Sequence, residues 1–338
     1  MTSRAFSIDG RTFAFDAPLG DALPIGAYVR IAVEGDRELL GQVLDEEIGA
    51  ASERVSGHGN LLADLDAGSG HLDGSAVFGS GTLEPAADDL VAAHLASSLG
   101  GSTGIELGEV QRMPGVPAQL HAKGFGRHTF LCGQSGSGKT YTLGIVLERL
   151  LLDTDITIVV GDPNSDYVNL QTLRPAAETG LGADDYRALA ERYEAVASRI
   201  HVFGLDASPN RLAVRFGRLT FEQQTMVLGI DPIADPEIYN AFVRTVNAIG
   251  DAEYSIDDII AASRSSFADD ERRLGLRIEN LGVDELSIWA RGHQPIAQVL
   301  PQDARMAVMD LGSVPSQRES SIAAAAMLGR LWENRHAR

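Results

Sequence analysis

The sequence predicts an α/β fold preceded by a small β-barrel, and three observations support this. Between residues 5 and 84, short alternating strand patterns are separated by Gly and Asp turns, as in small barrels. From about residue 113, strands alternate with helices, which is typical of a parallel sheet covered by helices. Residues 221–300 read as helix after helix and therefore as a helical insertion. We place the barrel domain at 1–112 and the α/β core at 113–338.

The N-terminal part contains two hairpin patterns. Apolar residues alternate along Phe6–Phe15 on both sides of Asp9-Gly10, a dipeptide that favours tight hairpin turns. A second pattern joins Tyr28–Val33 to Leu39–Leu44 across a turn that contains Gly and Asp. Residues 84–99 read as a short helix that follows the strands. We expect the strands to close into the barrel, and no catalytic pattern is visible among them.

The most specific motif is the run Gly133–Thr140, GQSGSGKT, which matches the phosphate-loop pattern G-x-x-x-x-G-K-[ST] without a mismatch. Its glycines let successive backbone N–H groups turn toward phosphate oxygens, and the following helix adds its N-terminal donors. The context agrees, because Arg127–Cys132 reads as a short buried strand and Tyr141–Leu152 as a helix with an apolar face. The chain has only two lysines, Lys123 and Lys139, so a chance lysine at this position is improbable.

Each fixed position of the loop has a chemical task. The Lys139 ammonium would reach the β- and γ-phosphates, and the Thr140 hydroxyl would ligate Mg²⁺. ATP and Mg²⁺ are therefore the predicted cofactors. The residues expected to bind the nucleotide are Gly133, Gln134, Ser135, Gly136, Ser137, Gly138, Lys139, Thr140 and Tyr141.

Hydrolysis needs an acidic strand end near Mg²⁺ and a group that orients the attacking water. Two predicted strands, 156–160 and 306–310, lead to Asp162 and Asp310, and neither aspartate is followed by the Glu that many ATPases use. A GTPase is disfavoured, because both lysines lie outside an Asn/Thr-Lys-x-Asp motif. The Ser-Gly-Gly-Gln signature of transporter ATPases is also missing.

Composition narrows the classes of function. The net charge of −19 argues against a surface coated for nucleic acid, although a local basic pore or groove remains compatible with it. Arg264, Arg272, Arg273 and Arg277 alternate with acidic residues, which favours a solvated helix face over a DNA-facing patch. One cysteine allows no internal disulfide, and the eight histidines show no zinc spacing. No run reaches the roughly 18 apolar residues that span a bilayer, so we expect a cytoplasmic protein without a membrane partner.

Leu107-Gly108-Glu109, Val116-Pro117 and the run 127–140 lie where the predicted barrel meets the predicted α/β core. Together these segments look like the junction between barrel and motor in the HerA-type ATPases, which belong to the HerA–FtsK superfamily of hexameric DNA translocases. The segment 160–168 is similar to the family's Asp-Pro-His-Gly-Glu-Tyr motif, but Asn164-Ser165-Asp166 replaces His-Gly-Glu and puts any role of that histidine in doubt. The order of barrel, phosphate loop, helical insertion and later strand also fits, so the resemblance covers essentially the whole chain.

The resemblance implies a RecA-like core that binds ATP and Mg²⁺ and pumps duplex DNA through a homo-hexameric ring. It also implies a nuclease or effector protein docked at the barrel end. Lys139 and Thr140 match the family's phosphate and Mg²⁺ positions. Asp162 matches an acidic position beside the nucleotide, and Arg127 an arginine that senses or stabilises the γ-phosphate.

In the family, the metal-binding Asp-Glu strand follows the helix that here ends at Arg338. We therefore expect either a fragment of a longer protein or, less readily, a short form without complete hydrolytic machinery. Two other functions stay open: a ring ATPase that powers secretion or conjugation, and a nucleotide-binding interaction module without turnover. A membrane anchor in a longer product would favour the former, and ATP binding without turnover the latter.

Overall fold

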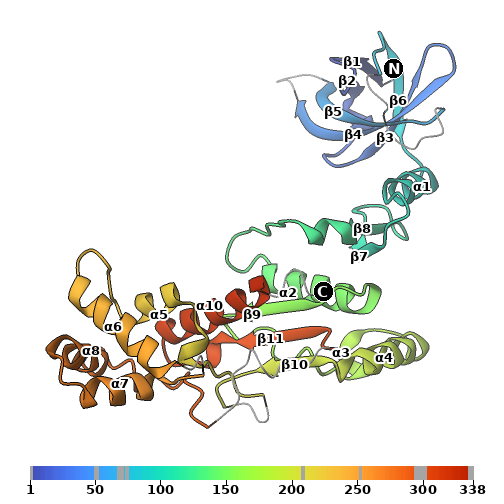
Figure 1. The fold of residues 1–338 in the computed structure, drawn as a ribbon. Helices are drawn as coiled ribbons and strands as arrows, with labels where there is room; N and C mark the ends of the chain where they lie inside the picture. Colours follow the sequence, from blue (N-terminus) through green and yellow to red (C-terminus); the bar gives the residue numbers. More distant parts are fainter. Residues whose placement is uncertain are drawn as a thin grey trace. The chain divides into compact units, whose positions relative to one another are not determined.

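A computed structural model describes residues 3–48, 53–66, 72, 76–206, 210–250, 253–292 and 303–333. The chain divides into two compact units, Met1–Arg149 and Leu150–Arg338 (Figure 1). The architecture is mixed α/β with an N-terminal barrel, as predicted. The domain boundary predicted at residue 112 and the RecA-like character of the core stay predictions.

Six antiparallel strands close into the barrel in the order β1-β2-β5-β4-β3-β6. The strands are β1 (Arg4–Ser7), β2 (Thr12–Pro18), β3 (Tyr28–Val33), β4 (Arg37–Ile48), β5 (Arg54–Asp64) and β6 (Gly81–Pro85), and the short helix η1 (Leu19–Asp21) follows β2. Both predicted hairpins are present, because β1 pairs with β2 and β3 pairs with β4. In β2, every second residue is buried, as expected for strands with one face toward the barrel interior.

Large rings fill the barrel interior where the facing strands carry glycine. Phe13 and Phe15 are buried, and a Cβ built on Gly41 would lie 2.6 Å from Phe13 Cε1. A Cβ on Gly57 would lie 2.7 Å from the Phe15 ring. Because real Cβ atoms do not approach carbon so closely, these glycines leave the volume that the two rings occupy.

The barrel is followed by α1 (Asp88–Ser98) and by a separate antiparallel hairpin of β7 (Gly104–Glu109) and β8 (Pro117–His121). The short helix η2 (Ala122–Gly126) leads to the phosphate loop.

The predicted buried strand over Arg127–Cys132 is wrong. These residues form no strand, they are exposed, and Phe130 is 90% exposed. A strand needs hydrogen-bonding partners on a neighbouring strand. Within the part of the chain that the structure describes, no strand pairs with this segment.

The second unit holds a parallel three-stranded sheet in the order β10-β11-β9. Its strands are β9 (Ile158–Asp162), β10 (Ile200–Phe203) and β11 (Met306–Asp310), at or near the predicted positions. The helices nearest to them in sequence are α2 (Lys139–Asp153), which crosses the boundary between the units, α3 (Ala176–Thr179), α4 (Ala183–Ala197), η4 (Leu311–Ser313) and α10 (Gln317–Glu333).

The region predicted as a helical insertion contains α5 (Phe221–Val227), α6 (Pro236–Ile249), α7 (Ile256–Ser265) and α8 (Asp269–Asn280), preceded by η3 (Phe216–Arg218). Thr220 and Ser255 begin α5 and α7 with reciprocal capping boxes, each satisfying helix N-terminal donors.

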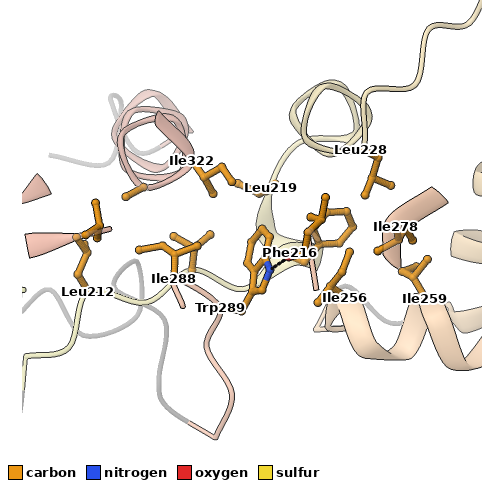
Figure 2. Close-up of a cluster of buried hydrophobic side chains, with 14 of the residues drawn as sticks. Leu212, Phe216, Leu219, Leu228, Ile256, Ile259, Ile278, Ile288, Trp289 and Ile322 are labelled. Atoms are coloured by element: carbon orange, nitrogen blue, oxygen red, sulfur yellow. Dashed lines mark hydrogen bonds between the residues drawn. The ribbon is translucent and has the colours of Figure 1, made fainter. Parts of the chain in front are cut away.

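The helical region shares one hydrophobic core with β11 and α10. Figure 2 shows Phe216 and Trp289 side by side within this cluster, with Ile256, Ile259 and Ile278 beyond Phe216. The Phe216 and Trp289 rings meet edge to face at a centroid distance of 5.7 Å. The insertion is therefore packed onto the α/β core.

Candidate nucleotide site

The phosphate-loop segment Gly133–Thr140 is folded as a tight, exposed loop at the start of α2. Gly136 and Gly138 have φ values of 77° and 84°, a region that glycine enters without steric cost. The Ser137 N–H donates to the Gln134 carbonyl at 3.2 Å and closes the turn between them. A side chain at either glycine would strain this turn.

The Lys139 side chain folds back over the loop. Its Nζ donates to the Gln134 carbonyl oxygen at 2.5 Å. Position 133 requires glycine, because a Cβ there would lie 2.6 Å from Ser137 Oγ and 3.4 Å from Lys139 Cγ. The loop therefore brings an ammonium group and glycine backbone together in a small exposed turn.

Helix α2 begins within the motif, so its first amide groups face the loop. Thr142 N–H donates to the Gly138 carbonyl at 2.9 Å, which starts the helical hydrogen-bond ladder. Lys139 and Thr140 are the first two residues of the helix, and Tyr141 is 66% exposed. A helix N-terminus next to a glycine turn is a general anion-binding arrangement.

Two residues ahead of the loop differ from expectation. Arg127 is exposed and follows η2, with its N–H donating to the Gly124 carbonyl at 3.1 Å. Cys132, the last residue of the predicted buried strand, is exposed. The predicted roles of Arg127, Lys139, Thr140 and the other loop residues in binding ATP stay predictions.

Asp162 belongs to the second unit and ends β9 with a fully buried carboxylate. Its oxygens accept the backbone N–H groups of the loop that follows: Asn164 at 3.4 Å, Asp166 at 3.0 Å and Tyr167 at 2.7 Å. The carboxylate therefore organises the turn after the strand, as aspartate side chains often do. The predicted position of Asp162 beside the nucleotide stays a prediction.

Asp310 lies opposite Asp162 in the parallel register of β11 and β9. Its Oδ1 accepts a hydrogen bond from Ser165 Oγ at 2.6 Å and another from the Ser313 N–H at 3.1 Å. Sequence reasoning noted Asp310 but missed Ser165. The spacing of Asp310 and Ser313 is typical of a turn stabilised by an aspartate side chain, so this contact could have been predicted from the sequence. No sequence pattern indicates the contact of Ser165 with Asp310.

The arginines of α7 and α8 confirm the solvated helix face. Each has a carboxylate neighbour: Arg264 with Glu279, Arg272 with Asp269, Arg273 with Glu237 and Arg277 with Asp235. Their charge is therefore balanced locally.

The described residues contain neither a metal-binding cluster nor a helix that could span a membrane. No group of three or more His, Cys, Asp or Glu side chains is arranged to hold a metal ion among them. No helix in the described ranges is long and apolar enough to cross a membrane.

The fold and the motif together define a mixed α/β protein in which a phosphate-loop sequence follows a β-barrel along the chain. A family model described as "Helicase HerA, central domain" matches residues 105–331, and the chain belongs to this family.

A weaker match is to the "DNA double-strand break repair helicase HerA" of Pyrococcus furiosus, with 32% identity over 97 residues. That alignment covers 28% of this chain and 16% of the relative. The chain thus matches only a small part of that protein's length.

Proposed function

We propose that the chain is the ATP- and Mg²⁺-binding subunit of a HerA-type DNA translocase. The observation that carries the proposal is the loop Gly133–Thr140, with two glycines at positive φ and a lysine folded over it at the start of a helix. Membership of the HerA central-domain family supports the same function.

The roles of the residues follow from phosphate chemistry. The loop amides and the α2 N-terminus would receive the phosphate oxygens, and Lys139 would exchange the Gln134 carbonyl for the β- and γ-phosphates. The Thr140 hydroxyl would ligate Mg²⁺. Mg²⁺ supplies charge neutralisation at the phosphates when it is bound. From the family resemblance, we infer that Asp162 takes the acidic position beside the nucleotide and that Arg127 senses or stabilises the γ-phosphate.

Assembly and substrate are inferred from the family. We infer a homo-hexameric ring with duplex DNA in a central pore and a nuclease or effector protein at the barrel. The overall charge of −19 makes the surface repulsive to DNA as a whole, so contact would be confined to a local basic lining.

The test is nucleotide binding by the whole chain, measured by calorimetry with Mg·ATP and Mg·ADP, followed by ATP turnover with and without duplex DNA. Lys139→Ala should abolish binding. Lys123→Ala is the matched control, since Lys123 is the other lysine of the chain and is exposed on η2. Equal affinity of the two variants, or no affinity of the native chain, would contradict the proposal. DNA-stimulated turnover supports a translocase, whereas binding without turnover favours a nucleotide-binding module.

A further inference from the structure

The last part of β4 extends beyond the strand that pairs with its first part in the barrel. β3 pairs with Arg37–Gln42, whereas β5 pairs with β4 as far as Ile48. Within the ranges that the structure describes, no strand pairs with the other side of Leu44–Ile48. Every residue of this segment is exposed. We call Leu44–Ile48 the open edge; at the rise of a β-strand it is about 17 Å long.

The open edge begins where a tight turn is bonded to β4. The Gly26 N–H donates to the Val43 carbonyl at 2.8 Å, and the Val43 N–H donates to the Ala27 carbonyl at 2.9 Å. Backbone bonding along this side of β4 therefore reaches Val43 and can continue along the next residues. The backbone N–H and C=O groups of an unpaired strand edge are a template for one more strand.

Large apolar side chains lie along the same surface. Ile25, in the turn bonded to β4, is exposed, and so are Leu44 and Ile48 at the two ends of the open edge. A segment that added itself to the edge would remove part of this apolar surface from water, which favours binding. The backbone and the side chains of this surface therefore suit an extended segment.

The open edge is also strongly acidic. Asp45, Glu46 and Glu47 follow one another and are exposed. Asp45 has a neighbour of opposite charge only when His58 is protonated, since the Nδ1 of His58 lies 3.0 Å from its Oδ1. In the described part of the chain, neither Glu46 nor Glu47 forms an ion pair. The edge therefore attracts positive charge.

Acidic side chains at a strand edge also act against self-association. Charged residues and bulges commonly protect such edges, and the register of β4 against β5 shifts between Val43 and Asp45. A second copy would bring its own run Asp45–Glu47 to the edge, and like charges disfavour that pairing. A segment that carries lysine or arginine is attracted by the same charges. The edge therefore selects its partner by charge.

We propose that the open edge binds an extended, basic segment of a partner protein as an added strand. The backbone of Leu44–Ile48 supplies the hydrogen bonds, the three acidic side chains pair with lysine or arginine, and Ile25 contacts an apolar side chain of the segment. All these residues belong to the first unit. The inference rests on the proposed function in one respect, because it gives the partner protein inferred at the barrel a contact surface. It requires no nucleotide.

The probe for the experiment is a synthetic peptide of alternating lysine and valine, about nine residues long so that it exceeds the open edge. The labelled peptide is titrated with the whole chain without nucleotide, and fluorescence anisotropy measures binding. A second peptide has proline in place of the inner valines, so it keeps the charge but cannot form a strand. The native chain should bind it at least about tenfold more weakly than the first peptide. A peptide of alternating glutamate and valine should not bind.

Variants of the chain locate the contact. Glu46→Gln combined with Glu47→Gln should weaken binding of the lysine–valine peptide about fivefold. The matched control combines Glu34→Gln with Glu106→Gln, which removes the same charge at exposed positions in the turn between β3 and β4 and on β7. This control should stay within about twofold of the native chain. Bound peptide should also slow hydrogen exchange of the amides of Leu44–Ile48.

Three results would overturn the proposal. The first is that the lysine–valine peptide does not bind, or binds no better than the proline peptide. The second is an equal loss of affinity in the two double variants, which would indicate attraction by the overall charge. The third is slower exchange at Leu44–Ile48 as the concentration of the chain alone rises, which would identify a second copy as the occupant. These measurements contain no nucleotide, so their failure is distinct from a failure of ATP binding, which Lys139→Ala tests.

Discussion

Asp162 and Asp310 stand opposite each other at the ends of β9 and β11, yet their carboxylates are held by different donors. Asp162 is buried and accepts backbone N–H groups from its own loop. Asp310 accepts a serine hydroxyl from the neighbouring strand's loop and the N–H group of Ser313. The two carboxylates therefore both fix the loop that follows β9. Asp162 binds the backbone of this loop, and Asp310 binds its Ser165 side chain.

The Asp162→Asn variant should lower the free energy of unfolding by about 1–3 kcal/mol, because the amide NH₂ would face a backbone N–H in the buried turn. Urea denaturation measures the change. Asp184→Asn is the control, since Asp184 is exposed at the start of α4. An Asp162→Asn variant no less stable than the control would show that the buried carboxylate does not hold the turn.

Glu319 should make the stability of the chain depend on pH. It is 3% exposed and receives hydrogen bonds from Ser287 N–H, Ser287 Oγ and Ser316 Oγ at 2.7, 2.6 and 2.9 Å. Burial by itself raises the pKa of Glu319, but the hydrogen bonds to Ser287, Ser316 and Ile288 outweigh it, and the net pKa is lowered.

A lowered folded-state pKa means that the stabilisation is fully present above the unfolded glutamate value of about 4.3 and is lost as the pH falls toward the folded pKa. The difference in unfolding free energy between the native chain and Glu319→Gln should therefore be constant near neutrality and shrink below about pH 4.5. Chemical denaturation at a series of pH values measures it. Glu285→Gln, at an exposed glutamate, is the control and should show no such trend. A difference that grows toward acid pH would contradict the prediction.

Local sequence was sufficient for much of this fold. Alternation around Asp9-Gly10 predicted the hairpin of β1 and β2, which pair from Arg4↔Asp16 to Ser7↔Phe13. The apolar run at Ile200–Phe203 gave β10 with its bounds. In both cases the deciding information, turn chemistry or an unbroken apolar run, lies within a few residues.

Non-local pairing explains what could not be predicted. Arg127–Cys132 has the composition of a strand, but strand formation depends on a partner that composition does not supply. The Ser165–Asp310 contact joins residues 145 positions apart, and no local sequence pattern predicts it. The phosphate-loop turn could be predicted because phosphate binding requires glycines and a lysine at fixed spacing within one short segment.

Arg305 should be essential to the end of α2. It is 7% exposed and donates to the carbonyls of Leu151, at 3.1 Å, and Thr154. Such carbonyls at a helix C-terminus have no partner within the helix. Arg305→Met should therefore cost about 2–3 kcal/mol of unfolding free energy and speed hydrogen exchange around residues 150–158.

The control for this prediction is Arg187→Met, because Arg187 is exposed and forms a surface ion pair with Asp184 on α4. Denaturation of both variants in urea gives the comparison. Equal stability of the two variants would show that Arg305 does not support the helix end.

The two tryptophans should report separately on the core of the second unit. Trp289 is 4% exposed, with Nε1 donating to the Val283 carbonyl at 2.6 Å and its ring against Phe216 (Figure 2), whereas Trp332 on α10 is 68% exposed. Trp332→Phe leaves only Trp289, so its fluorescence should lie at shorter wavelength and resist quenching by acrylamide. Trp289→Phe leaves only Trp332, should quench readily, and should lose about 1–3 kcal/mol of stability through the unpaired Val283 carbonyl and the smaller ring. Equal quenching of the two variants would show that Trp289 lies outside the core. It would contradict the packing of the helical insertion onto β11 and α10.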